Sequence, residues 1–162
     1  MSAIIRNFTP VSAWADRWTK PTMEKLLEPL KEHHRQGLEH LLEQAETLDR
    51  VNQSLIWYGP SWKWTIQLSL VDDQSNDQTS LGYLVPNLER PIVCIPLDES
   101  MLSALPSRRL GRFINEGIRS AKCAVAVHWA TWTPNSFSEV KLLADLMKRK
   151  VKIILAAQGT GK

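Results

Sequence analysis

The chain has 162 residues, of which 43% are hydrophobic, and its formal net charge is +3. This size and composition predict one domain with a continuous core, and so small a charge does not by itself indicate a nucleic-acid-binding protein. An apolar run of about 18 residues, which a membrane-spanning helix would need, is absent, and the first residues lack the apolar segment of a signal peptide. We therefore expect a cytoplasmic protein in which Cys94 and Cys123 are free thiols.

The first part of the chain is expected to form an arm and a pair of helices. Residues 1–21 carry two tryptophans without a clear period and are interpreted as the arm. Thr22 is a suitable N-cap for a short helix from Met23, which Pro29 would stop. A longer helix should restart near Pro29 or Leu30. Its apolar stripe is formed by Leu38, Leu41, Leu42, Ala45 and Leu48.

The middle of the chain changes to a period of two, which is typical of a half-buried strand. Apolar residues alternate with polar ones from Trp62 to Leu70, and the preceding Gly59-Pro60 indicates a turn. This pattern predicts a hairpin with the segment Ser54 to Tyr58. Two further strands, Leu81 to Val85 and Ile92 to Leu97, would extend an antiparallel meander.

Helices dominate the expectations for the last third of the chain. Asp98 is a plausible N-cap of a short helix, and Ser107 of a second one that reaches Ala121. The remaining expectations are a single strand from Cys123 to Thr133, a helix after Ser136, a short strand from Val151 to Leu155 and a frayed end from Gly159 to Lys162. Together these elements predict an α+β fold, in which helices cover one face of an antiparallel sheet of about five strands. The single domain is expected to span residues 22–155, followed by a flexible tail over 156–162.

Seven tryptophans make the sheet the first candidate for a ligand-binding surface. At a period of two, Trp62 and Trp64 would share a face that Trp57 can join across the hairpin. Trp129 and Trp132 are three positions apart, so in a strand they point to opposite faces and one of them can be exposed as a ligand contact. Packing in the core would explain the same pattern, because an indole buries a large apolar area.

A basic helix is the second candidate. Arg112 and Arg119, with Arg108 and Lys122, could form one broad face whose guanidinium groups bind phosphate or carboxylate. An ordinary solvated helix face is the alternative. The predicted ligand-binding set is Trp57, Trp62, Trp64, Trp129, Arg112 and Arg119. The predicted partner is a small anionic or aromatic ligand or another protein, and the absence of a nucleic-acid-binding motif argues against DNA or RNA.

Two other kinds of chemistry are conceivable. Glu39, His40 and Glu43 lie within one helical stretch and offer oxygen and imidazole ligands for iron or zinc, although a solvated acidic face has the same appearance. His128 is the one nominee for a catalytic base, and a hydrogen-bonded core histidine is the alternative. No catalytic residue is assigned, and no cofactor is expected unless the iron alternative holds.

The chain resembles the YdhG-like group of small bacterial α+β domains, most of which have no known function. The resemblance covers Thr22 to Ile154. It rests on the order of elements, on the run from Trp57 to Trp64, on His128-Trp129 and on the segment Glu139 to Leu143. Some members are described as frataxin-like iron chaperones, which would imply an acidic surface for which only the glutamates from Glu24 to Glu46 are available. We therefore expect a non-catalytic binding module, with a metal-handling chaperone and an enzyme acting on an anionic substrate as alternatives.

Overall fold

The computed structural model describes residues 12–72, 75 and 77–159. Six antiparallel strands form one sheet in the order β1-β2-β3-β4-β6-β5. The strands are β1 (Val51–Trp57), β2 (Trp64–Val71), β3 (Gln78–Val85), β4 (Ile92–Asp98), β5 (Lys122–Ala124) and β6 (Val127–Trp132). The helices are α1 (Met23–Leu27), α2 (Glu32–Glu46), α3 (Glu99–Ala104), α4 (Ser107–Arg119) and α5 (Phe137–Gly159). The expected α+β class is confirmed, with six strands in place of about five.

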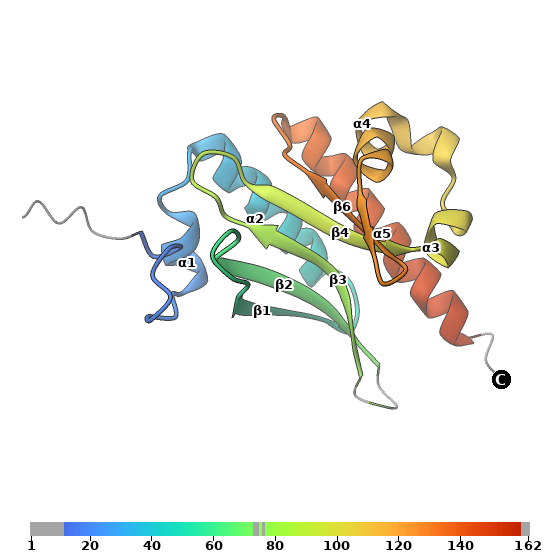
Figure 1. The fold of residues 1–162 in the computed structure, drawn as a ribbon, viewed down its shortest axis with the longest axis horizontal. Helices are drawn as coiled ribbons and strands as arrows, with labels where there is room; N and C mark the ends of the chain where they lie inside the picture. Colours follow the sequence, from blue (N-terminus) through green and yellow to red (C-terminus); the bar gives the residue numbers. More distant parts are fainter. Residues whose placement is uncertain (1–11, 73–74, 76, 160–162) are drawn as a thin grey trace, which may run out of the picture.

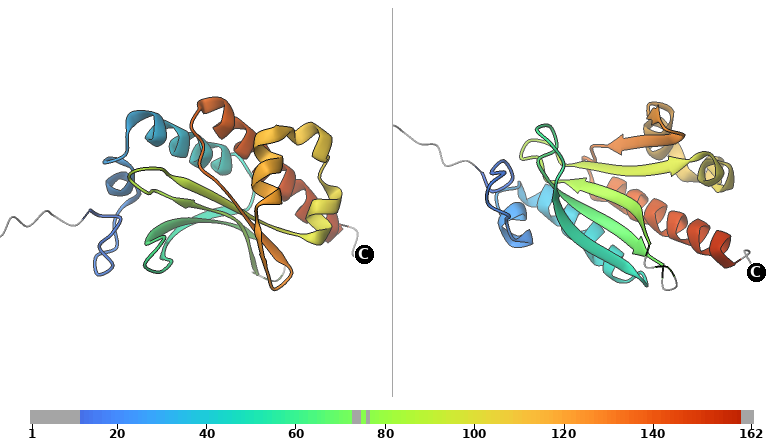
Figure 2. Two further views of the ribbon diagram at one scale, coloured as in Figure 1. Left: turned by 45° about the horizontal axis from the view of Figure 1, so that its top comes forward. Right: turned by 60° about the horizontal axis from the view of Figure 1, so that its bottom comes forward.

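The main helices lie on one face of the twisted sheet (Figures 1 and 2). Helices α2 and α5 pack against each other, and α4 packs beside α5 over strand β6. The short helix α1 lies at the end of the sheet near the turn between β1 and β2 (Figure 1). The arrangement therefore gives the sheet a helix-covered face and an open face.

The helix-covered face forms the main hydrophobic core. In β2, every second residue points to this side, from Ile66 through Leu68 to Leu70, and all three side chains are buried. Leu38 and Leu41 of α2 and Leu143 of α5 close the core from above. A Cβ on Gly37 would lie only 3.1 Å from the Val140 side chain, so this glycine permits the close approach of α2 to α5.

Several local expectations are confirmed. The Thr22 hydroxyl accepts a hydrogen bond from the backbone of Lys25, and the Asp98 carboxylate accepts one from Met101, so both residues act as N-caps. The helical break at Pro29 is also present, with the second helix beginning at Glu32. Ser107, in contrast, is the first residue of α4 and makes no side-chain cap; the N-cap position is Pro106.

Two expected strands are wrong. The segment Cys123 to Thr133 is a hairpin, because Val125 and Ala126 adopt positive φ angles of 52° and 61° and reverse the chain between β5 and β6. Neither residue type favours this conformation, so composition gave no turn signal. The segment Val151 to Leu155 continues helix α5, since Val151 and Ile154 remain on its buried side and nothing after Lys150 stops the helix. Of the tail expected over 156–162, residues 156–159 also belong to α5, and residues 160–162 lie outside the described residues.

Candidate functional site

Four aromatic side chains form a continuous row across the open face. The ring centroids of Tyr58 and Trp62 are 4.9 Å apart, Tyr58 and Tyr83 are 5.2 Å apart, and Tyr83 and Trp129 are 6.1 Å apart. These separations are within the range of favourable aromatic pairs. The strand register places Tyr83 and Trp129 on the same face. Tyr83 is opposite Cys94 of β4, Trp129 of β6 is opposite Pro96, and Cys94 and Pro96 share a face because they are two positions apart. We call Trp62, Tyr58, Tyr83 and Trp129 the aromatic row.

The members of the aromatic row differ in exposure. Tyr83 is 6% exposed and anchors the row, whereas Tyr58 is 40% exposed and Trp62 and Trp129 are half-buried. Burial raises the pKa of the Tyr58 phenol, and the nearby Tyr83 and Cys94 raise it further. The Tyr58 hydroxyl therefore stays protonated and can donate a hydrogen bond. The row offers an apolar surface with a polar edge.

The sheet opens beside the aromatic row, between strands β3 and β4. Their pairing covers only Tyr83 to Val85 with Ile92 to Cys94. Beyond it lies Pro96, which has no N–H to continue the ladder. The ammonium of Lys150 reaches this gap from α5 and donates to the backbone carbonyls of Ser80 (2.8 Å), Leu81 (3.2 Å) and Pro96. The buried ammonium therefore replaces the missing strand-to-strand hydrogen bonds.

A cavity of about 220 Å³ lies over this gap. Trp129, Pro96 and Val127 contribute apolar walls, while Asp98 and Lys150 contribute charge. The complete lining is Thr79, Ser80, Pro96, Asp98, Met101, Val127, Trp129 and Lys150. Trp129 thus belongs both to the cavity and to the aromatic row, which makes the two features one continuous site.

The charged groups of the cavity balance each other. Burial lowers the pKa of Lys150 to about 8, although the neighbouring Cys94 and Asp98 act in the opposite direction. Hydrogen bonds from Ser100 and Met101 hold the pKa of Asp98 below its usual value. At neutral pH we therefore expect an ammonium and a carboxylate in this cavity. Within the described part of the chain, the buried Ser80 hydroxyl, in a residue that lines the cavity, has no hydrogen-bond partner.

Cys94 lies between the aromatic row and Lys150. Its thiol is buried, and this burial raises its pKa to about 12, with a smaller opposing influence from Lys150. A thiol in this state is a poor nucleophile and behaves as a small apolar side chain. Cys94 therefore contributes shape to the site rather than reactivity.

Trp62 also packs against a second hydrophobic cluster, which involves Trp57 and Trp64. The rings of Trp57 and Trp64 pack edge to face with centroids 5.8 Å apart, and Trp64 is buried with Trp14 and Leu26. The Trp64 indole donates to the Asp16 carbonyl at 2.6 Å, which fastens residues of the arm to the hairpin. The expected common face fails because β2 begins only at Trp64 and Lys63 has a positive φ of 58°. Trp62 precedes the strand, and its ring meets Tyr58 and Tyr83.

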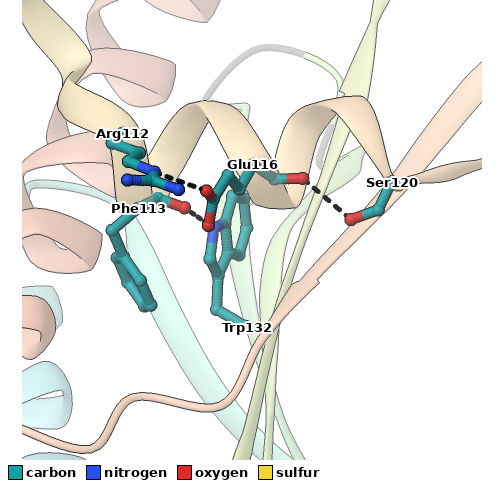
Figure 3. Close-up of polar contacts among 5 residues, drawn as sticks. All are labelled: Arg112, Phe113, Glu116, Ser120 and Trp132. Atoms are coloured by element: carbon teal, nitrogen blue, oxygen red, sulfur yellow. Dashed lines mark hydrogen bonds and ion pairs between the residues drawn. The ribbon is translucent and has the colours of Figure 1, made fainter.

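The predicted arginines lie on the other side of the sheet. Arg112 bonds Glu116 through its Nε at 2.7 Å on the solvent side of α4, and this bond raises the pKa of the guanidinium (Figure 3). The same helix covers Trp132, whose indole donates to the Phe113 carbonyl at 3.1 Å. Arg119 is exposed at the end of α4. Because Trp132 and Trp129 point to opposite faces, the structure does not bring the arginines together with the aromatic row.

The candidate metal ligands do not form a cluster. Glu39 lies 3.9 Å from Arg35, the His40 ring packs against Phe137 with centroids 4.8 Å apart, and Glu43 is exposed. Among the described residues, no group of three or more histidine, cysteine or acidic side chains could hold a metal ion. His128, the nominee for a catalytic base, has its Nε2 2.8 Å from Oε1 of Glu99, and its side chain is 22% exposed.

A second cavity, of about 70 Å³, lies between α2 and the start of α5. His33 and His34 line it with Pro91, Pro134 and Phe137. Burial and the nearby His33, Lys31 and Arg90 lower the pKa of His34. This cavity is smaller than the one beside Trp129, and no aspartate, glutamate, lysine or arginine lines it.

Sequence reasoning did not identify Tyr58, Tyr83 or Lys150 as parts of the site. A signal for Lys150 was present, because it follows Leu143, Leu146 and Met147 at the spacing of the apolar stripe of α5. A lysine at a core position needs partners. The proline within strand β4 could have indicated where carbonyl groups lack donors.

No family model, curated protein or solved structure matches the chain. The resemblance to the YdhG-like group therefore stays a prediction. Among the described residues, no helix is long and apolar enough to cross a membrane.

Proposed function

We propose that this protein is a non-catalytic binding module whose ligand lies on the open face, along the aromatic row. The observation that carries the proposal is the chain of ring contacts from Trp62 through Tyr58 and Tyr83 to Trp129, on a face that the main helices leave uncovered. Partly exposed aromatic side chains beside a cavity are typical of ligand and partner contacts, because they offer a large rigid area at low entropic cost.

The cavity beside Trp129 favours a small ligand, or a single side chain of a protein partner. Its apolar walls suit an aromatic or aliphatic group, and the unpartnered Ser80 hydroxyl suits a polar atom on that group. All three hydrogens of the Lys150 ammonium have carbonyl acceptors, so an anionic ligand would have to displace one of them. We therefore favour an aromatic ligand over the anionic one.

The proposed site is tested by a thermal-shift screen of metals, nucleotides, phosphorylated metabolites and amphipathic small molecules. A ligand that binds only the folded state raises the melting temperature. The shift caused by an aromatic compound should disappear in Trp129→Ala and Trp62→Ala. The matched control is Trp18→Ala, because Trp18 is 87% exposed and lies outside the aromatic row. Equal shifts in all three variants would contradict the proposal.

The alternative, an iron- or other metal-handling chaperone, depends on Glu39, His40 and Glu43. Among the described residues, no group of three such side chains could hold a metal ion, so no geometric observation supports this alternative. Calorimetric titration with ferrous iron tests this alternative, because an ion bound there would have to lose affinity in Glu43→Gln.

We further propose that the protein works in the cytoplasm, because both Cys94 and the exposed Cys123 are free thiols.

A further inference from the structure

We infer that strand β1 pairs edge to edge with β1 of a second copy of this chain, so that the two sheets join into one. β1 is the outermost strand on its side of the sheet, with β2 as its one neighbour (Figure 1). The edge is separate from the open face that carries the aromatic row, so this inference does not depend on the proposed binding function.

The hydrogen bonds at the two ends of the β1–β2 pair show which backbone groups point outward. The N–H of Tyr58 donates to the carbonyl of Lys63, and the N–H of Val71 donates to the carbonyl of Arg50, both at 2.8 Å. In an antiparallel pair, residues that bond the neighbouring strand alternate with residues whose N–H and C=O point away from it. The register therefore directs the even-numbered residues of β1 toward β2. The outward residues are Val51, Gln53, Leu55 and Trp57.

The outward backbone groups form a row that only another strand can complete. Within the described residues, no hydrogen bond engages the backbone N–H or C=O of the outward residues. A row of such groups along a strand edge is a template for pairing with another chain.

The two edges of the sheet differ in how they resist such pairing. Proteins protect an edge with a short strand, a charged side chain, a proline or a bulge. The opposite edge, β5, has three exposed residues and carries Lys122. β1 has seven residues without charge or proline, and its register with β2 is uninterrupted. β1 therefore lacks the protection that β5 has.

Apolar side chains accompany the open row. Val51 and Leu55 are opposite Leu70 and Ile66 of β2, so they lie on the helix-covered face, and both are only partly buried where they meet the core. Trp57 on the same face is also partly buried. A strand beside β1 would cover these side chains, which adds apolar burial to the hydrogen bonds.

A second β1 fits the edge over its whole length. With a two-fold axis at Ser54, Val51 is opposite Trp57 of the other copy, and Gln53 is opposite Leu55. Outward residues of one copy then meet outward residues of the other, so both sets of backbone groups are satisfied. Since β1 has no charged residue, no like charges meet across the axis.

Two arguments favour a second copy over a peptide of another protein. The second β1 is already extended by its pairing with β2, so it loses less conformational entropy on binding than a disordered peptide does. Two-fold pairing also uses both β1 edges at once, and the joined sheet then ends in the short, charged β5 on either side. The assembly therefore closes at two copies.

Sedimentation equilibrium of the full chain over a wide concentration range tests the inference, and we expect a reversible dimer. Gln53→Pro removes an outward N–H in each copy, which a strand edge tolerates but a dimer does not. Its dissociation constant should rise about a hundredfold, because two hydrogen bonds are lost and their acceptors are left unpaired. Gln53→Ala is the matched control. It also loses the side-chain bond to the Leu42 carbonyl but keeps the N–H, so it should dimerise like the wild type.

A charge exchange at Ser54 tests the register and does not depend on proline. Ser54 is exposed, and the proposed axis places it opposite its own copy. Ser54→Lys and Ser54→Glu should each weaken the dimer about fivefold, because like charges meet, whereas a mixture of the two variants should form a tighter heterodimer. Thr131→Lys adds the same charge on β6, far from this edge, and should change nothing.

Three results would overturn the inference. A wild-type chain that stays monomeric at every concentration would leave the edge to an extended segment of another protein. Equal dimers of Gln53→Pro and Gln53→Ala would place the interface on another surface. If Gln53→Pro does not fold, as judged by circular dichroism, the Ser54 variants decide, and a mixture no tighter than its components would exclude this register.

Discussion

Two tryptophans of strand β6 have opposite environments although only two residues separate them. Trp132 is 4% exposed under helix α4, where its indole donates to a backbone carbonyl. Trp129 is half-buried on the open face, where its ring meets Tyr83 and lines a cavity. The two side chains lie on opposite faces because successive residues of a strand point to opposite sides of the sheet, and these two residues are an odd number of positions apart. A tryptophan of β6 is therefore part of the core where a helix covers it, and a candidate ligand contact where no helix does.

The same contrast holds for the two faces as a whole. The helix-covered face is aliphatic and closed, with Ile66, Leu68 and Ile95 inaccessible to solvent. The open face instead combines aromatic rings with small polar residues such as Ser80 and Thr131. Stability should therefore depend mainly on the first face, and binding on the second.

The largest expected effect tests this division with one residue from each face. Trp132→Ala should lower the free energy of unfolding by about 3–5 kcal/mol, the usual cost of deleting a large buried aromatic side chain. Trp129→Ala should cost about 1 kcal/mol, because its ring is already partly in solvent. Urea denaturation of both variants measures the difference. Equal losses would mean that the open face is part of the core.

Replacing Lys150 comes next. Lys150→Met keeps the buried stem but leaves three carbonyls without their donor, and a buried unsatisfied polar group costs about 1–3 kcal/mol. We expect a loss of about 3 kcal/mol, since water from the adjoining cavity can replace part of the contacts. Lys152→Met is the control on the exposed side of α5 and should change stability by less than about 0.5 kcal/mol. A neutral Lys150→Met would show that the gap between β3 and β4 does not need the ammonium.

A smaller effect is expected at the contact between α4 and β6. A Cβ on Gly117 would overlap the Trp132 indole, so Gly117→Ala should cost about 1–3 kcal/mol. In a Trp132→Phe background the same change should cost less, because the overlapping part of the ring is gone. A double-mutant cycle by chemical denaturation measures this coupling. If the free-energy changes of Gly117→Ala and Trp132→Phe are strictly additive, the cost of Gly117→Ala does not come from the contact with Trp132 and must arise elsewhere, for example in the geometry of the helix.

The smallest effect concerns the ion pair on α4. Arg112 and Glu116 are both solvent-exposed, and exposed pairs of this kind contribute little to stability. Arg112→Ala should leave the melting temperature unchanged within error, and it should not weaken any ligand that depends on Trp129. A ligand whose thermal shift disappears in Arg112→Ala would restore the basic helix as the binding surface.

The sequence patterns predicted the elements with strong periods or caps. The alternation up to Leu70, the stripe from Leu38 to Leu48 and the caps at Thr22 and Asp98 all carried their signal locally, although β2 begins at Trp64 and not at the expected Trp62. The β5–β6 hairpin escaped prediction because its turn uses Val125 and Ala126, whose positive φ angles are held by pairing on either side. The end of α5 escaped because an apolar segment of five residues suits a strand or a buried helix equally well.

For the candidate site, sequence analysis proposed Trp62 and Trp129 but not their neighbours. Tyr58 and Tyr83 join the row only through the pairing of β1 to β4 in sequence order, which no local pattern specifies. Lys150 meets Ser80 and Pro96 across the interior of the fold. Such meetings depend on topology, and for the same reason no local pattern could show that the arginines of α4 lie across the sheet from the aromatic row.

The position of Lys150 has a consequence for the order of folding. Its ammonium bonds residues 54 to 70 positions earlier in the chain, so these contacts have high sequence separation. The hairpin of β1 and β2 and its extension by β3 need only nearby residues and can form early. The junction of β3 with β4 cannot be completed until α5 has left the ribosome. Nascent chains that end before Lys150 should therefore hold a half-joined sheet, which refolding or arrest experiments would detect as a late step.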